Sequence, residues 1–171
     1  MPDLIRHDGI HDDEWTLVSA PEENQELTLP DGPAILPAAV WKENREQYAG
    51  RNDIGIWFDS HEEPEAFANM IDDLPVIAVN FPKFTDGRGY SIARLLRERY
   101  GYKGELRAVG DVLLDQLFYM KRCGFDAYAL RPDKDISQAE QCLNVFSNTY
   151  QAAVDTKEPL FRRRKAETAT S

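Results

Sequence analysis

The residues best suited to chemistry lie in the stretch Asp86-Gly87-Arg88-Gly89-Tyr90-Ser91. Two glycines let the backbone approach a ligand closely, and free N–H groups at the start of a following helix attract an anion. The guanidinium of Arg88 is a bidentate partner for phosphate, sulfate, sulfite or carboxylate. The stretch therefore predicts a small-anion site built from Gly87, Arg88, Gly89 and Ser91. The alternative is a tight turn in which Ser91 caps the helix and Arg88 points into solvent.

Arginines from other parts of the chain are expected to add positive charge to this site. Arg94 lies one turn into the following helix, so we expect it to face the same space. Arg107 or Arg131 is expected to supply further charge. The stretch lacks the third glycine of a dinucleotide fingerprint and the Gly-Lys-Ser/Thr ending of a Walker loop. The sequence therefore names an anion site without naming a cofactor.

Acid–base catalysis is a second hypothesis for the same region. The candidate groups are Asp86, Asp111 and Tyr90, because two neighbouring carboxylates can have pKa values that are pushed apart. Asp111 also fits the role of a helix N-cap, which is the structural alternative for that residue.

The histidines and cysteines do not form a recognisable metal or redox site. His7 and His11 are four residues apart in an acidic, flexible segment, and His61 is expected in a solvent-exposed loop. Cys123 and Cys142 lie on different predicted helices without CxxC spacing, and the four thiolates that usually hold an iron–sulfur cluster are not available. We predict no metal site and two buried, reduced thiols.

Five strand–helix units are expected to position the candidate residues. Apolar and β-prone runs predict strands at 34–36, 54–58, 76–81, 105–110 and 125–130. The predicted helices follow them, at about 37–49, 64–74, 90–100, 111–123 and 136–150. This repeat specifies an α/β fold with a parallel sheet flanked by helices. We favour an open doubly wound sheet over an incomplete β/α barrel, because five units fall short of eight.

In either arrangement, ligands bind beyond the carboxyl ends of the strands. Polar residues lie at or just beyond the carboxyl ends of the predicted strands: Asp59-Ser60-His61, Asn80, Thr85 to Ser91, Gly110-Asp111 and Arg131-Pro132-Asp133. We therefore expect the candidate groups to gather at one end of the sheet.

The chain is predicted to form a single α/β domain at residues 33–154 with two appended segments. Residues 1–32 are expected to be irregular and to hold a short hairpin, with β-prone runs at Thr16-Leu17-Val18 and Leu27-Thr28-Leu29. Residues 155–171 are polar, contain Arg162-Arg163-Arg164-Lys165 and predict a loose tail.

Composition narrows the classes of partner. A net charge of −10 argues against nucleic-acid binding, which needs a basic face. The sequence has neither an apolar run long enough to span a membrane nor a signal-peptide pattern, so we expect a cytoplasmic protein. The edge strands of the sheet need covering by the N-terminal hairpin or by a second copy of the chain, which favours a homodimer.

Three sequence blocks resemble a known family. They are FPKFTDGRGYSIARLLR at 81–97, GELRAVGDV at 104–112 and RCGFDA at 122–127. Together they resemble the bacterial domain-of-unknown-function family 934, and the likeness runs from about Pro33 to Tyr150. The resemblance implies an oxidoreductase involved in sulfite reduction, with sulfite or nitrite reductase as its partner.

Three functions remain open on this basis. The sequence has no four-cysteine cluster set, c-type haem motif or dinucleotide fingerprint. We therefore expect an accessory protein of assimilatory sulfite reduction that binds a small anion at Gly87 to Ser91. The alternatives are a stand-alone enzyme that uses Asp86 and Asp111, and a protein-binding module that docks a reductase through the face near Arg94 and Arg97.

Overall fold

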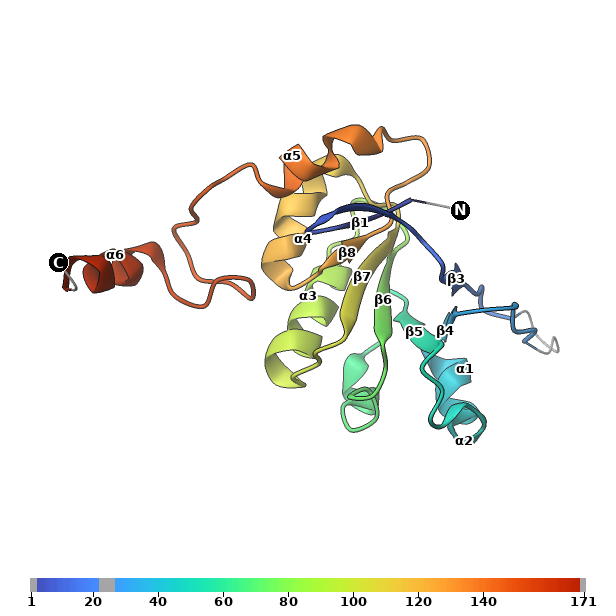
Figure 1. Ribbon diagram of the computed structural model, residues 1–171. Helices are drawn as coiled ribbons and strands as arrows, with labels where there is room; N and C mark the ends of the chain where they lie inside the picture. Colours follow the sequence, from blue (N-terminus) through green and yellow to red (C-terminus); the bar gives the residue numbers. More distant parts are fainter. Residues whose placement is uncertain (1–2, 22–26, 170–171) are drawn as a thin grey trace.

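The apolar runs of the chain form one mixed sheet of eight strands (Figure 1). The computed structural model describes residues 3–21 and 27–169. The strands are β1 (Asp3–Arg6), β2 (Gly9–Asp12), β3 (Thr16–Leu17), β4 (Ala34–Pro37), β5 (Ile54–Phe58), β6 (Val76–Phe81), β7 (Glu105–Gly110) and β8 (Ala127–Tyr128). Their order across the sheet is β2-β1-β8-β7-β6-β5-β4-β3.

All five predicted strands are present, and they run parallel as consecutive neighbours from β4 to β8. In a doubly wound sheet the strand order reverses at a switch point. Here each successive strand from β4 to β8 is added on the same side of the previous one, so the order never reverses. The prediction of a doubly wound sheet is therefore wrong. Right-handed crossovers that always step one way leave their helices on one face. The strand order is the one found in a segment of a β/α barrel.

The N-terminal segment extends the sheet at both edges. β1 and β2 form an antiparallel hairpin, in which Gly9 has the positive φ of 133° that glycine tolerates. β1 also adds antiparallel to β8, and β3 adds parallel to β4. The hairpin is thus formed by residues 3–12 and not by the runs at 16–18 and 27–29, and the sheet is mixed instead of parallel.

Short helices connect the parallel strands. They are α1 (Ala38–Glu43), α2 (Arg45–Tyr48), α3 (Arg88–Arg94), α4 (Leu117–Cys123) and α5 (Ala139–Leu143), and α6 (Leu160–Ala169) follows them. Single turns of 3-10 helix occupy Pro64–Phe67, Leu114–Gln116 and Ile136–Gln138, and a π-helical turn at Leu95–Arg99 continues α3. The predicted helix at 64–74 is only the single turn Pro64–Phe67. Tight turns follow it, such as the one in which the backbone N–H of Leu74 donates to the carbonyl of Ile71 at 3.1 Å.

The predicted helix over 136–150 also ends early. α5 stops at Leu143, because the side-chain amide of Asn144 donates to the carbonyl four residues earlier at 3.1 Å and competes with the next helical turn. Leu143 is buried, whereas Phe146 and Tyr150 are 61% and 68% exposed. The chain then runs away from the sheet and ends in α6, inside the segment predicted as a loose tail (Figure 1).

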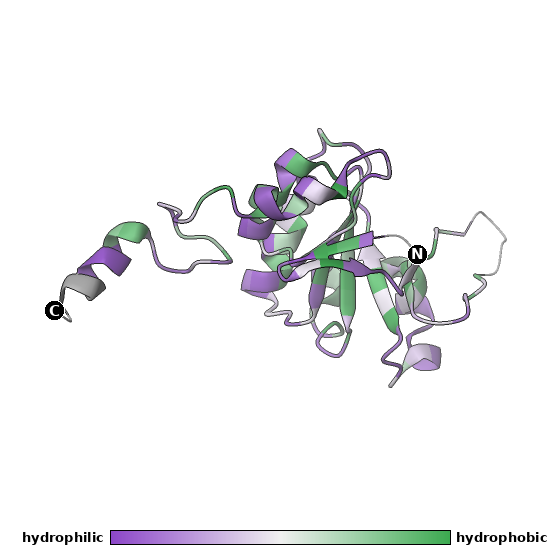
Figure 2. Ribbon diagram, turned by 45° about the horizontal axis from the view of Figure 1, so that its top comes forward, coloured by the Kyte–Doolittle hydropathy of each residue, from purple (hydrophilic) through white to green (hydrophobic). Residues whose placement is uncertain are grey.

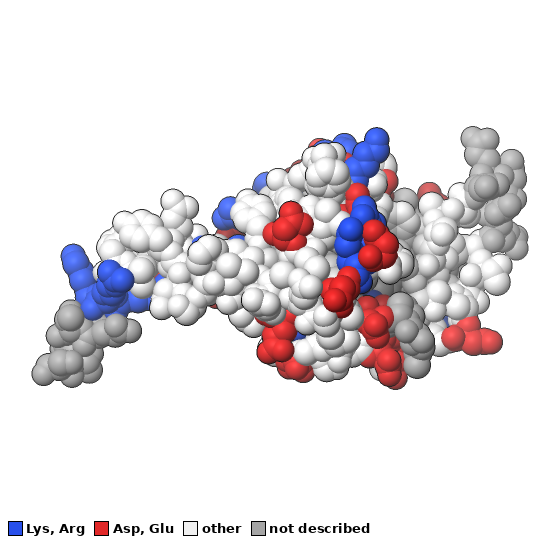
Figure 3. Space-filling view, turned by 90° about the horizontal axis from the view of Figure 1, so that it is seen from above, with Lys and Arg blue, Asp and Glu red and all other residues white. Residues whose placement is uncertain are grey.

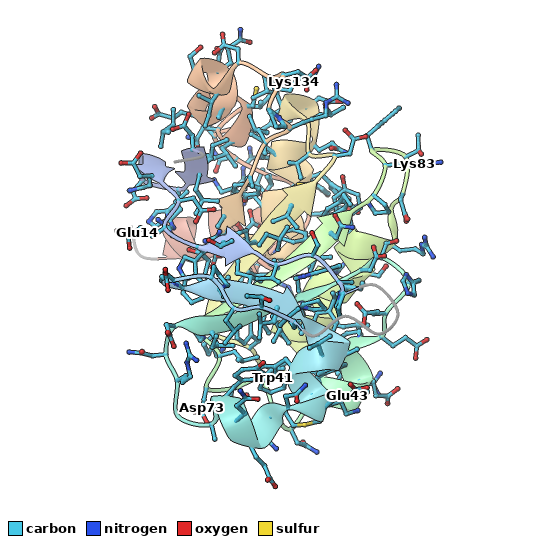
Figure 4. All side chains as sticks on the ribbon, turned by 90° about the vertical axis from the view of Figure 1, so that its right-hand side faces the viewer. Glu14, Trp41, Glu43, Asp73, Lys83 and Lys134 are labelled. Carbon is cyan, nitrogen blue, oxygen red and sulfur yellow. The ribbon has the colours of Figure 1, made fainter. Side chains whose placement is uncertain are left out.

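The main core lies between the sheet and the helices. Ile56, Val79 and Leu106 of three neighbouring strands are fully buried in it. Trp41 of α1 and Ile92 of α3 pack from the helix side, and Figure 4 shows Trp41 between its helix and the strands. Figure 2 shows the same separation, with hydrophobic strands inside and polar residues on the outer helices. Burial of these apolar side chains is the main force that joins the two layers.

The N-terminal segment covers the second face of the sheet, where the strands present a smaller apolar cluster. The buried members of this cluster are Ile35, Val76, Ala78 and Val109. Trp15 and Trp57 pack against them. The indole N–H of Trp57 donates to the carbonyl of Val18 at 2.9 Å, which fixes the segment across the strands.

A buried ion-pair network holds the N-terminal segment on this second face. The side chain of Arg107 in β7 is 1% exposed, and its Nη1 donates to both oxygens of Asp13 at 2.9 and 2.7 Å. Its Nε and Nη2 donate to Glu105 at 2.9 and 2.7 Å. The other oxygen of Glu105 accepts from Nε of Arg6 at 2.8 Å. The charge of Arg107 is therefore matched inside the fold.

Replacing Arg107 by alanine is expected to lower the free energy of unfolding by about 3 kcal/mol, because it leaves a buried carboxylate without its partner. Asp13→Asn is expected to cost less, since the amide oxygen still accepts from the guanidinium. Denaturant unfolding measures both values. A loss below about 0.5 kcal/mol for Arg107→Ala, the range of ordinary surface changes, would contradict the role given to this network.

Candidate functional site

The carboxyl ends of β5 to β8 meet at one end of the sheet. The loops 59–63, 82–87, 111–113 and 129–135 lie there, and we call this region the carboxyl edge. Seen from above, basic side chains at this end are flanked by acidic ones (Figure 3). Lys83 and Lys134, from two of the loops, lie at the same end in Figure 4.

Arg88, the predicted anion-binding arginine, is engaged by a neighbouring carboxylate. Its Nε and Nη2 donate to Oδ1 and Oδ2 of Asp86 at 2.9 and 2.6 Å. Its backbone N–H donates to Oδ1 of Asp86 at 3.1 Å, and Nη2 also donates to Oγ of Ser60 at 2.9 Å. The sequence predicts an external anion between the Arg88 guanidinium and the start of α3. In the structure the carboxylate of Asp86 occupies that position.

This pairing determines the protonation of Asp86. Hydrogen bonds from Arg88 hold the pKa of the Asp86 carboxyl well below its ordinary value, and the same bonds raise the pKa of Arg88. Asp86 therefore stays ionised at neutral pH and is a poor general acid. The Arg88 side chain is still 61% exposed, and its Nη1 makes no hydrogen bond with the described residues. The solvent side of the Arg88 guanidinium is therefore exposed.

Residues at the carboxyl ends of β5 and β6 support the Arg88 side chain. Ser60 is 5% exposed and accepts one N–H of the guanidinium. Nδ2 of Asn80 donates to Oδ1 of Asp59 at 3.1 Å, and Oδ2 of Asp59 lies 3.3 Å from Nδ1 of His61. The sequence predicts these residues at the carboxyl edge without assigning any of them to the anion site. The signal for Ser60 was its position directly after a buried strand.

Asp111 belongs to a second ion-pair group at the carboxyl edge. Its Oδ2 accepts the backbone N–H of Phe84 at 2.8 Å, and its Oδ1 accepts Nη1 of Arg131 at 2.8 Å. Arg131 also donates to Asp133 at 2.5 and 3.0 Å, which lowers the pKa of Asp133 to about 2. Asp111 therefore ties the loop before α3 to the loop after β8, and Leu113 stands at the N-cap of the next helical turn.

Gly89 and Tyr90 pack α3 against its neighbours. A Cβ on Gly89 would lie 2.7 Å from the ring of Phe81, so glycine permits the close approach of α3 to β6. The ring of Tyr90 packs against Phe81 and Tyr119 with centroid distances of 5.2 and 4.9 Å. Burial raises the pKa of the Tyr90 hydroxyl, so it stays protonated at neutral pH. Ser91 is exposed and follows the first turn of α3 without capping it.

The other predicted arginines are divided between the two ends and the second face of the sheet. Arg107 is part of the buried network described above. Arg94 is exposed on α3, pairs with Glu98 at 3.2 Å and borders a cleft at the opposite end of the sheet. Of the predicted arginines, Arg88 and Arg131 are the two that lie at the carboxyl edge.

The thiols offer little redox chemistry. Cys123 is buried, and burial raises the pKa of its thiol, whereas the reactive form is the thiolate. Cys142 is free and half-buried, not fully buried as predicted. Within residues 3–21 and 27–169, no three His, Cys, Asp or Glu side chains gather in a way that could hold a metal ion. In the same part of the chain, no helix is both long enough and apolar enough to cross a bilayer.

Comparison with known proteins identifies a family but no characterised relative. A family model described as "Bacterial protein of unknown function (DUF934)" matches residues 55–161, which is more than half of the chain. No curated protein and no solved structure matches the chain.

Two glycine variants test the close packing of α3 on β6. Gly89→Ala is expected to lower the free energy of unfolding by about 1–3 kcal/mol, because the new methyl group overlaps the fully buried ring of Phe81. Gly87→Ala is the matched control, since its nearest contact would be a ring carbon of Tyr90 at 3.9 Å. Thermal unfolding of both variants measures the difference. Equal stability of the two variants would refute this packing role.

Proposed function

The chain belongs to the bacterial DUF934 family, and on that premise we propose that it is an accessory protein of assimilatory sulfite reduction that binds a small oxyanion beside Arg88. The reductase would supply the redox centre, and this chain would hold or deliver the anion. The expected location is the cytoplasm, where free thiols such as Cys123 and Cys142 stay reduced. The expected partner is sulfite or nitrite reductase, in line with the sequence resemblance.

One observation carries the proposal: the donors around Asp86 already hold an oxygen anion. The backbone N–H, Nε and Nη2 of Arg88 converge on the Asp86 carboxylate. Charge-assisted donors of this kind also bind the oxygens of small oxyanions. The open Nη1 gives an incoming anion a first contact. The anion then binds beside the Asp86 carboxylate or replaces it.

Stand-alone acid–base catalysis receives less support. It would use Asp86, Asp111 and Tyr90, but Asp86 is held ionised by Arg88. Both oxygens of Asp111 accept hydrogen bonds, and Tyr90 packs between aromatic rings. These contacts favour a role in positioning over one in proton transfer.

Exposed apolar side chains favour a second candidate function, protein binding through the C-terminal arm, by which we mean residues 144–169. Val145, Phe146, Tyr150 and Phe161 are between 49% and 68% exposed on this arm. Apolar groups that gather on a protein surface mark interaction sites. A reductase is the partner proposed for the arm, and a second copy of the chain, which would form a homodimer, is the alternative. Arg97, by contrast, belongs to the face first proposed for docking a reductase. Its side chain is only 12% exposed and pairs with Asp126 within the fold at 2.7 Å.

Anion binding is expected to respond in opposite directions to two changes at the carboxyl edge. Arg88→Ala should lower the affinity for sulfite and sulfate at least about tenfold, since it removes a charge-assisted contact. Asp86→Asn should raise the affinity, because the resident carboxylate no longer competes for the guanidinium. Isothermal titration measures both.

The matched control is Arg99→Ala, which removes another exposed arginine; within the described residues its single ion pair, with Glu65, is long at 3.9 Å. Its affinity for sulfate should equal that of the unmodified chain. If Arg88→Ala and Arg99→Ala bind sulfate equally, the Arg88 site does not exist.

The arm can be tested independently of the anion site. Tyr150→Ser and Phe161→Ser should abolish retention of sulfite reductase on the immobilised chain without altering its unfolding midpoint, because both rings face solvent. Ile10→Ser, at a residue 49% exposed on β2, serves as the control. Analytical ultracentrifugation of the same variants gives their molecular mass and so shows whether the chain forms a homodimer. If both arm variants retain sulfite reductase as well as the unmodified chain does and have the same molecular mass in solution, the proposed protein-binding function of the arm is wrong.

A further inference from the structure

A cleft of about 950 Å³ lies at the end of the sheet opposite the carboxyl edge. It is bordered by the residues that lead into two strands, Gly101 to Lys103 before β7 and Gly124 to Asp126 before β8. The same cleft is bordered by Arg94 and Arg97 at the end of the α3 segment. Parallel strands begin at one end of the sheet and finish at the other, so this cleft is separate from the Arg88 site.

One wall of the cleft is part of the C-terminal arm, residues 152–157. Nη1 of Arg122 in α4 donates to Oδ1 of Asp155 at 2.7 Å and to Oγ1 of Thr149 at 3.1 Å. The backbone N–H of Val154 donates to the carbonyl of Arg122 at 3.2 Å. The Arg122 side chain is 11% exposed. These bonds anchor the wall to α4.

Each carboxylate that borders the cleft has an arginine partner. Glu98 pairs with Arg94 at 3.2 Å, and Asp126 pairs with Arg97 at 2.7 Å. Asp155 pairs with the anchoring arginine of α4 at 2.7 Å. The negative charges of the lining are therefore matched within the fold.

Three lysines border the same cleft without a carboxylate partner. In the described part of the chain Lys103 and Lys157 make no hydrogen bond or ion pair, and Nζ of Lys121 donates only to the amide oxygen of Asn144 at 3.3 Å. The chain as a whole has a net charge of −10. Unmatched ammonium groups gathered around one cleft of such a chain create a local field that attracts anions.

The lysines and the apolar lining together define the class of ligand. Ala152, Ala153 and Val154 of the arm contribute exposed or half-buried apolar surface to the cleft. We propose that the cleft binds a phosphorylated small molecule of nucleotide size, with its phosphates toward the lysines and its apolar part against the wall formed by Ala152, Ala153 and Val154. Several ammonium groups match the several charges of a di- or triphosphate. The volume falls within the roughly 300–1,000 Å³ of small-molecule sites.

Titration of the full chain with ADP tests the proposal, with amide chemical shifts to locate the site and calorimetry to give the affinity. ADP is expected to shift the amides of residues 101–103, 124–126 and 152–155. Lys103→Glu and Lys157→Glu should each weaken ADP binding about tenfold, because each removes a charge-assisted contact. Both lysines are exposed, so the variants keep the fold. Inorganic pyrophosphate should bind at the same residues more weakly, since it lacks the apolar part.

Lys42→Glu provides the matched control, because it changes the net charge equally at an exposed position on α1. Its affinity for ADP should equal that of the unmodified chain. The proposal is overturned if neither ADP nor pyrophosphate binds at millimolar concentration, or if Lys103→Glu and Lys157→Glu bind ADP as tightly as the unmodified chain. Loss of ADP binding in Arg88→Ala alone would place the ligand at the carboxyl edge and would also overturn it.

Discussion

Burial of the Arg107 guanidinium in the second face of the sheet is the constraint on which the rest of the structure depends. A charge this deep is tolerated only with matched carboxylates, and Asp13 and Glu105 supply them. The N-terminal segment must therefore lie across the strands, where Trp15 and Trp57 fill the space beside it. With helices on one face and this segment on the other, the two ends of the parallel strands are left for ligands.

The two ends of the sheet differ in how their charges are matched. At the carboxyl edge, Arg88 and Arg131 each donate to a carboxylate at less than 3 Å. The proposed oxyanion would therefore have to share the donors of Arg88 with Asp86 or displace it. At the opposite end, arginines neutralise the carboxylates of the cleft and the lysines are left over. A phosphorylated ligand can bind at that end without displacing any group of the protein.

The early end of α5 links the cleft to the C-terminal arm. Had the helix continued to Tyr150, the chain would have covered α4 with one more apolar stripe. Because it stops at Leu143, residues 152–157 run past α4 and become a wall of the cleft, while Phe146 and Tyr150 stay in solvent. Ligand binding in the cleft and partner binding on the arm would therefore involve the same segment. This arrangement offers a physical route by which one event could influence the other.

The sequence by itself determined which segments become parallel strands, because short apolar runs such as 54–58 and 76–81 are typical of strands that are covered on both faces of a sheet. It also determined that Arg88 and Asp111 share one end of that sheet, since the ends of parallel strands coincide. Tertiary structure alone decided that Ser60 contacts Arg88, that Asp13 pairs with the buried Arg107 and that the strands wind in one direction. Strand propensity and the tendency to be buried are local properties of a segment, so they can be inferred from the sequence. Contacts between distant segments and the order of the strands depend on which segments the fold brings together, so only the structure decides them.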